Sequence, residues 1–192
     1  MTGGILSDSA IRHAVECGDI VIDPFDPAHL NPCSYDLTLG DEVAVYRDWV
    51  LAIDDGLGLR PRDYILDIKH EPKVHRFAIP ADGAVLDPGI GYLMHTVERI
   101  ATKKYVPVID GKSSLGRLFM KVHETAGYGD PGFSGNYTLE VTVQHPLRIY
   151  AGMRVAQIRF HTIVGNVEKP YAGNYVKKTA TGPVASRAWR QF

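Results

Sequence analysis

The 192-residue sequence predicts a mainly β protein, either a β-barrel or a β-sandwich, with one short helix near the N-terminus. Apolar and polar residues alternate in many short runs, as they do in strands that have one buried face. Turn-forming residues interrupt these runs at intervals of roughly eight to twelve residues, which is the spacing of short antiparallel strands. No internal repeat or low-complexity linker divides the chain, so we expect a single domain.

The helix is expected directly after Ser7, whose hydroxyl suits an N-cap. Leu6 and Ile11 have the spacing of a hydrophobic staple, and Gly18 is a typical stop signal. The proline-containing run 23–27 then predicts a turn region that belongs to no helix or strand.

The remaining chain alternates clearly enough to predict a series of short strands. They are expected at 34–39, 42–46, 85–86, 92–96, 105–109, 136–142, 147–150 and 155–161. Residues 47–83 are punctuated by prolines and predict an irregular excursion or a hairpin, and a polar turn is expected around 99–104. Residues 169–192 show little apolar periodicity, which fits either a frayed terminus or a flap that orders over a ligand.

Composition excludes several classes of protein. The chain is 45% hydrophobic and 22% charged, as ordinary soluble globular domains are. Its formal net charge is −1 and it has no long basic block, so nucleic acid is not an expected partner. No apolar run reaches the length of a membrane span, and the N-terminus lacks a signal-peptide pattern. Cys17 and Cys33 lie in unrelated contexts, which favours a reducing cytoplasm.

Residues 110–117 carry the strongest chemical signal. Lys112 and Arg117 supply cations, and Ser113 and Ser114 supply hydroxyls, on a segment whose glycines let backbone N–H groups approach a ligand. Cations, hydroxyls and amides together suit phosphate. The segment therefore predicts a phosphate-binding site.

Two carboxylates follow this segment. Asp130 lies in a turn rich in glycine and proline, and Glu140 lies on the polar face of the strand 136–142, together with Thr138. The same alternation assigns Tyr137 to the opposite, apolar face. A phosphate cradle, an acid in a turn and an acid on a strand together predict a nucleotide site.

An ordered set of segments over nearly the whole chain resembles the dCTP deaminases, which belong with the trimeric dUTPases in one β-fold superfamily. These segments are Ile5–Asp8, Ser34–Gly40, Asp110–Arg117, Asp130–Glu140, Gly152–Gln157, Pro170-Tyr171 and Gly182–Arg187. The resemblance implies one domain over residues 1–192, folded as a dUTPase-like distorted jelly-roll β-barrel. It also implies a homotrimer with active sites at subunit interfaces and a C-terminal flap over residues 169–192.

The resemblance also assigns roles to individual residues. Glu140 is expected to be the catalytic acid and base, and Asp130 to lie near the deoxyribose and to orient the water that attacks the α-phosphate in a dUTPase reaction. Substrate binding is expected from Lys112, Ser113, Ser114, Arg117, Ala126, Asp130, Thr138, Gln157, Tyr171 and Lys178. Mg²⁺ is expected on the triphosphate, without protein ligands of its own.

The chemistry of deamination agrees with this assignment. Attack of water at C4 of cytosine and departure of ammonia both need a proton to move, and one partly desolvated carboxylate can serve both steps. The alternative is a zinc-bound hydroxide, which is marked by H-x-E with P-C-x-x-C. His123-Glu124 lacks the intervening residue and no cysteine pair exists, so we expect no zinc.

Two places depart from the usual family pattern. Asn174-Tyr175 stands where relatives have Lys-Tyr. The glutamine that follows in relatives is absent from the longer segment here, in which Lys177 or Lys178 is a candidate for the replacement cation. Gly127-Tyr128 replaces the His-Arg pair of the monofunctional bacterial deaminases and is closer to the bifunctional enzymes, which also cleave dUTP.

The sequence therefore predicts hydrolytic deamination of dCTP to dUTP and ammonia, with hydrolysis of dUTP to dUMP and pyrophosphate as a candidate second step. The alternatives are a dUTPase without deaminase activity, a deaminase of a modified cytosine deoxynucleotide, and a non-catalytic nucleotide-binding trimer with a regulatory role. The expected ligands are dCTP and dUTP, with dTTP as a candidate inhibitor.

Overall fold

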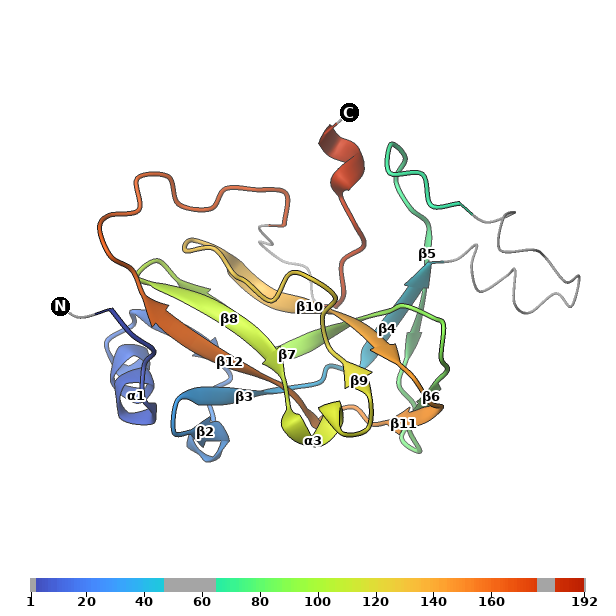
Figure 1. Ribbon diagram of the computed structural model, residues 1–192, viewed down its shortest axis with the longest axis horizontal. Coiled ribbons are helices and arrows are strands. Elements are labelled where there is room, and N and C mark those ends of the chain that lie inside the picture. Colours follow the sequence, from blue (N-terminus) through green and yellow to red (C-terminus); the bar gives the residue numbers. More distant parts are fainter. Residues whose placement is uncertain (1–2, 47–64, 176–181, 192) are drawn as a thin grey trace, which may run out of the picture.

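The computed structural model describes residues 3–46, 65–175 and 182–191, and it confirms the mainly β class (Figure 1). Its helical elements are α1 Asp8–Glu16, η1 Pro27–His29, α3 Ser113–Gly116 and η2 Ala188–Gln191. Its strands are β1 Ile20–Asp23, β2 Leu30–Asn31, β3 Ser34–Thr38, β4 Glu42–Tyr46, β5 Val74–Ala78, β6 Ala84–Leu86, β7 Tyr92–Thr102, β8 Tyr105–Gly111, β9 Met120–Lys121, β10 Ser134–Val143, β11 Leu147–Ile149 and β12 Arg154–Thr162.

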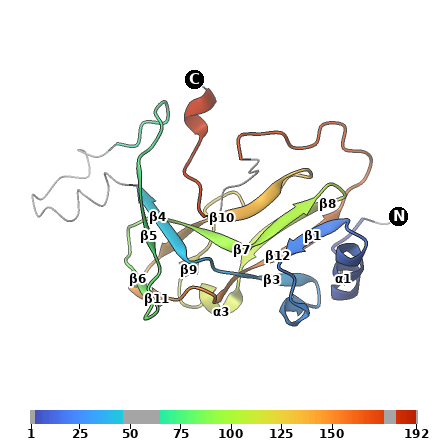
Figure 2. The same ribbon diagram turned by 180° about the vertical axis from the view of Figure 1, so that it is seen from behind.

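The described strands form three antiparallel sheets. The largest has the order β5-β4-β7-β10-β9, and β1 also pairs with β7. A second sheet has the order β2-β3-β12-β8, and β6 pairs with β11 in a third. Apolar side chains from both larger sheets form one core, among them Tyr35, Leu37, Met94, Leu139 and Phe160. The helix α1 lies at one end of the molecule and β5 at the other (Figures 1 and 2).

The helix α1 begins and ends where the sequence predicts. Ser7 is its N-cap, and its hydroxyl accepts a hydrogen bond from the backbone N–H of Ala10 at 3.4 Å. Ile11 and Ala14 are buried on one face, and Gly18 follows the helix with a φ of 76°. A left-handed residue directly after the last turn is the usual helix stop, and glycine adopts it without strain.

Two turns that the sequence predicts are partly replaced by regular elements. The polar turn expected around 99–104 is wrong in its first half, because β7 continues to Thr102 and pairs there with β1 and β10. The turn expected at 23–27 is also wrong at both ends, because Asp23 closes β1 and Pro27 opens η1. Sheet pairing on both sides of β7 satisfies the backbone groups of this polar stretch, which local alternation does not reveal.

The region 47–83 contains a strand that the sequence did not predict. The strand β5 pairs antiparallel with the predicted strand β4, with Glu42 opposite Ala78 and Tyr46 opposite Val74. Residues 47–64 of this region lie outside the described part of the chain. The strands β4 and β5 are important for the site because the described C-terminal segment packs against them.

Candidate functional site

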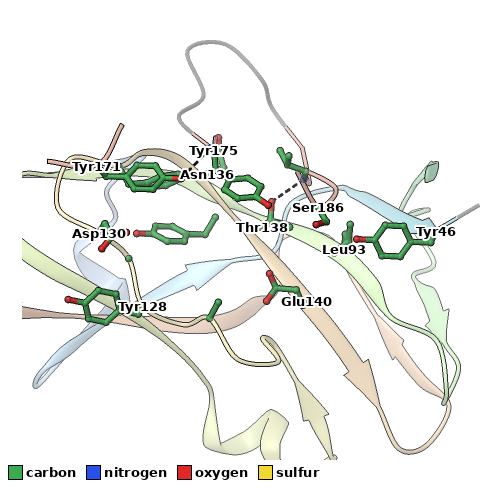
Figure 3. Close-up of a pocket in the computed structure, with 15 residues that line it drawn as sticks. Tyr46, Leu93, Tyr128, Asp130, Asn136, Thr138, Glu140, Tyr171, Tyr175 and Ser186 are labelled. Atoms are coloured by element: carbon green, nitrogen blue, oxygen red, sulfur yellow. Dashed lines mark hydrogen bonds between the residues drawn. The ribbon is translucent and has the colours of Figure 1, made fainter. Parts of the chain in front are cut away.

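A pocket of about 400 Å³ lies between β10, the turn before it and the C-terminal segments. Five of the predicted site residues line it: Ala126, Asp130, Thr138, Glu140 and Tyr171. Figure 3 shows Thr138 and Glu140 on β10, and Tyr171 and Tyr175 on the C-terminal side. The structure therefore brings the two predicted carboxylates, which are ten positions apart in the chain, into one pocket.

Glu140 is the half-buried carboxylate of the pocket. Burial raises the pKa of Glu140 above the ordinary value of a glutamate, because desolvation disfavours the charged form. Hydrogen bonds from the backbone N–H groups of Glu140 and Glu124, and the nearby charge of His123, oppose this shift, whereas the charge of Glu124 adds to it. The result is a carboxyl group that gains and releases a proton more readily near working pH than an exposed one does.

Asp130 lies in the glycine- and proline-rich turn, and backbone hydrogen bonds hold this turn in place. The N–H of Gly129 donates to Pro107 O at 2.8 Å, and the N–H of Gly132 donates to Thr102 O at 2.7 Å. The N–H of Tyr171 donates to Pro131 O at 2.9 Å, so the tail is also attached here. Asp130 itself is exposed at the rim, available to a ligand.

The described part of the C-terminal segment covers one side of this pocket. The N–H of Val184 donates to the Thr138 hydroxyl at 3.0 Å, and the N–H of Tyr175 donates to the Tyr171 hydroxyl at 3.2 Å (Figure 3). The Tyr175 hydroxyl in turn accepts from the N–H of Arg187 at 3.0 Å. These contacts place residues of the tail over the pocket of the same chain.

The predicted phosphate segment lies elsewhere in this chain. Ser113 and Ser114 open the single turn α3, and Lys112 contacts the buried carboxylate of Asp36 at 2.5 Å. The Arg117 guanidinium donates to Ser113 O at 2.9 Å. None of these predicted residues lines the pocket, and no described residue that does so is a lysine or an arginine.

Two further predicted residues also remain outside the pocket as described. The Gln157 side chain donates to Gly111 O at 3.2 Å and accepts from the Ser34 hydroxyl at 3.3 Å, so it braces the end of β8. Lys178 and Lys177 lie outside the described residues. Among the described residues, the pocket of one chain therefore holds the acids of the predicted site without Lys112 and Arg117.

Several residues that line the pocket were not predicted from the sequence, and Tyr137 is the most informative of them. Strand alternation assigned it to the apolar face, but it lines the pocket beside Asn136 and Thr138. The reason is an irregularity in the pairing of β10 with β7 between Asn136 and Thr138. Tyr46 and Tyr175 also line the pocket. They lie far from β10 in the sequence, and no sequence pattern indicated that they belong to the site.

The described residues supply little to bind a metal directly. No three His, Cys, Asp or Glu side chains converge within the described ranges. The two pocket carboxylates, Asp130 and Glu140, are the acidic donors there. This donor set fits a Mg²⁺ ion whose ligands come chiefly from nucleotide phosphates and water.

Separately, no helix among the described residues is long and apolar enough to cross a membrane.

Comparison with known proteins gives this geometry its context. The family model described as dCTP deaminase-like matches residues 5–163. The chain belongs to this family. Two relatives, from Hathewaya histolytica and Clostridium acetobutylicum, are both named "dCTP deaminase, dUMP-forming". Each is 40% identical to this chain, and the matched regions include 93% of this chain and 95% and 94% of the two relatives, respectively. A relative of the same name from Leptospira biflexa is 41% identical over 82% of each chain.

A solved structure supports the fold. The 2′-deoxycytidine 5′-triphosphate deaminase from Agrobacterium tumefaciens superposes with a TM-score of 0.61 at 22% identity. The superposition covers 84% of this chain and 49% of the other, so this chain spans about half the length of that protein. The family resemblance and the fold predicted from it are both confirmed.

Proposed function

We propose that the protein deaminates dCTP by hydrolysis and then hydrolyses the dUTP to dUMP and pyrophosphate. The observation that carries this proposal is the presence of Glu140 and Asp130 in one pocket, the first half-buried and the second exposed at the rim. Two carboxylates in different positions permit two hydrolyses in one pocket, and relatives at 40% identity are named "dCTP deaminase, dUMP-forming". The environment of each acid suggests which reaction it serves.

Glu140 is the proposed acid and base of the deamination. Its carboxylate takes a proton from water as the oxygen attacks C4 of cytosine, and it then gives that proton to the departing amino group. Water and dCTP thus become dUTP and ammonia. The raised pKa of Glu140 serves both halves, because the group must hold the proton between them.

Asp130 is the proposed base for the second hydrolysis. Its carboxylate orients a second water for in-line attack on the α-phosphorus of dUTP, so that the bond to the bridging oxygen breaks and pyrophosphate leaves. The exposed position of Asp130 at the rim gives it access to water and to the phosphate end of a nucleotide whose base lies at Glu140. Thr138, Ala126 and Tyr171 line the pocket and are proposed to contact the nucleotide.

The cations are proposed to come from a second copy of the chain. Because Lys112 and Arg117 lie outside the pocket of their own chain, a homotrimer with interfacial sites would let a neighbouring copy present its segment 112–117 to the triphosphate. Gln157 and Lys178 are proposed to contribute to the same composite site. Mg²⁺ bound to the phosphates would neutralise part of their charge.

Two finer proposals follow from the same pocket. Because dTTP carries the same sugar and triphosphate as dUTP, it is a candidate competing ligand, which a dTTP titration of the deamination rate would reveal. We also propose a cytoplasmic location, which the free and exposed thiols of Cys17 and Cys33 support.

The direct test is chromatography of the products formed from dCTP and Mg²⁺. The proposal expects dUMP and pyrophosphate, with one ammonia released for each dCTP consumed. Accumulation of dUTP would restrict the function to deamination, and turnover of added dUTP without ammonia release from dCTP would leave a dUTPase. No product from either nucleotide would contradict the proposal.

A further inference from the structure

One face of the paired strands β4 and β5 contacts the described end of the tail. Side chains two residues apart on a strand point to the same face, so Glu42 and Tyr46 of β4 share one face. Arg76 of β5 stands opposite Ala44 and therefore lies on that face as well. All three polar side chains meet the backbone of the tail segment 182–186.

Arg76 joins this face to the tail. Its guanidinium donates one hydrogen bond to the Glu42 carboxylate and another, at 2.8 Å, to Pro183 O. A guanidinium is planar, so the carboxylate that pairs with it also orients its other N–H groups toward the carbonyl. Gly182 has a φ of 93°, and a Cβ there would lie 2.6 Å from Glu42 Oε1, so the tail backbone approaches the carboxylate directly.

The next residues of the tail form part of the pocket wall. The N–H of Val184 donates to the Thr138 hydroxyl at 3.0 Å, and the N–H of Ser186 donates to the Tyr46 hydroxyl. Thr138, Ser186 and Tyr46 lie at one end of the pocket (Figure 3). Val184 and Ser186 line the pocket, whereas Arg76 does not. Arg76 is therefore linked to the pocket through the backbone of the tail.

We propose that Arg76 is a positioning residue for nucleotide binding, which holds the Pro183 carbonyl and thereby keeps the tail in the pocket wall. The inference rests on the proposed function. Neither Arg76 nor its partner Glu42 lies in a segment that carries the family resemblance, so the contact is a feature of this chain. Apparent affinity falls with the fraction of molecules whose site is complete, so loosening this contact raises KM without altering the chemical step.

The first test is Arg76→Met, which keeps an aliphatic side chain and removes both hydrogen bonds. KM for dCTP is expected to rise about tenfold, while kcat stays within about threefold of wild type. Gly182→Ala changes the same contact from the side of the tail. It should give the same division between KM and kcat, because its methyl group would overlap Glu42 and alanine is disfavoured at this positive φ.

Fluorescence of Trp189 measures the position of the tail without any turnover. Trp189 belongs to η2, directly after the held segment, and its ring Nε1 is buried. The other tryptophan, Trp49, lies outside the described residues and is replaced by phenylalanine in every protein compared. In the free protein, Arg76→Met should increase quenching of Trp189 by acrylamide and shift its emission to longer wavelength. A loss of stability that leaves the protein folded would move neither.

Arg148→Met is the matched control. The Arg148 guanidinium also donates to backbone carbonyls, to Asp82 O at 2.9 Å and to Gly83 O at 3.4 Å, but Arg148 does not line the pocket. Its replacement should lower the thermal midpoint and leave KM for dCTP and the quenching of Trp189 unchanged.

The inference requires both effects of Arg76→Met, the higher KM and the greater quenching. It is overturned if either effect is missing, if kcat falls instead of KM rising, or if Arg148→Met shows the same two changes. A wild-type protein that turns over neither dCTP nor dUTP would instead refute the proposed function. The calorimetric Kd for dUTP then replaces KM: a weaker Kd in Arg76→Met alone supports the inference, and equal values, or no binding to the wild-type protein, contradict it.

Discussion

Replacing Glu140 with glutamine keeps the size of the side chain and removes its ability to exchange a proton. A positioned acid or base contributes roughly 10²–10⁴-fold to a rate. Because Glu140 is proposed to act in both the attack of water and the departure of ammonia, we expect kcat for deamination to fall by about 10⁴-fold. Affinity for dCTP, measured by calorimetry, should stay within about threefold, which is a change below about 1 kcal/mol.

The same substitution should also change how stability depends on pH. Burial raises the folded-state pKa of Glu140 above its ordinary value, so the folded protein binds more protons than the unfolded one between those two values. Stability therefore falls as the pH rises through this window, and the loss is complete above the folded-state pKa. Glu140→Gln should match the wild-type thermal midpoint at low pH and exceed it at neutral pH.

Glu124→Gln is the control for this experiment. Glu124 carries the neighbouring carboxylate, which accepts a hydrogen bond from the Thr142 hydroxyl at 2.8 Å, but it is exposed and does not line the pocket. Its loss should leave ammonia release within about threefold of wild type, as most surface substitutions do. The reasoning is refuted if Glu140→Gln releases ammonia at the wild-type rate, or if Glu124→Gln is the more damaging change.

Three further predictions concern Asp130 itself and residues close to the two acids. His123→Gln should move the acidic limb of the pH profile of kcat/KM to higher pH, because the charge of His123 lowers the pKa of Glu140; an unmoved limb would remove His123 from the electrostatics of the site. Asp130→Asn should slow pyrophosphate release from dUTP by about 100-fold while ammonia release from dCTP falls less than about tenfold, and equal losses in product assays would contradict separate roles. Gly129→Ala should destabilise the protein by about 1–3 kcal/mol, because its methyl group would overlap the Tyr137 hydroxyl and the backbone at Pro107; an unchanged calorimetric midpoint would argue against this packing.

Much of the fold could be predicted from local patterns, because each pattern reports a face of a single element. The strand β4 was predicted with the bounds that the structure has, and the N-cap at Ser7 is confirmed. The strands that were missed depend on pairing instead. The polar half of β7 is ordered by β1 and β10 on either side, and β5 is ordered by β4. Local sequence carries little of that information.

In the candidate site, too, some residues could be predicted from the sequence, whereas others depend on how the strands pair. Glu140 and Asp130 could be predicted from residue type and from the family resemblance, and the structure brings both into one pocket. Tyr137 could not, because its orientation follows from the extra residues of β7 opposite it, among them Thr96 and Val97. An alternation rule applied to one strand assumes regular pairing with the next, and it fails where a bulge changes the register.

The distribution of charge suggests why the chain would need copies of itself. The pocket holds two carboxylates, and among the described residues that line it there is no lysine or arginine to offset a triphosphate. Lys112 and Arg154 instead lie 2.5 Å and 3.5 Å from the two carboxylate oxygens of buried Asp36, so one carboxylate there faces two cations.

The surplus positive charge around Asp36 is suited to phosphate, but it lies outside the pocket of its own chain. If a neighbouring copy supplies it, specific activity should fall on dilution together with dissociation of the assembly, measured by sedimentation at matched concentrations. Specific activity that persists in isolated chains would mean that one chain holds a complete site, and that the separation of acids from cations has another origin.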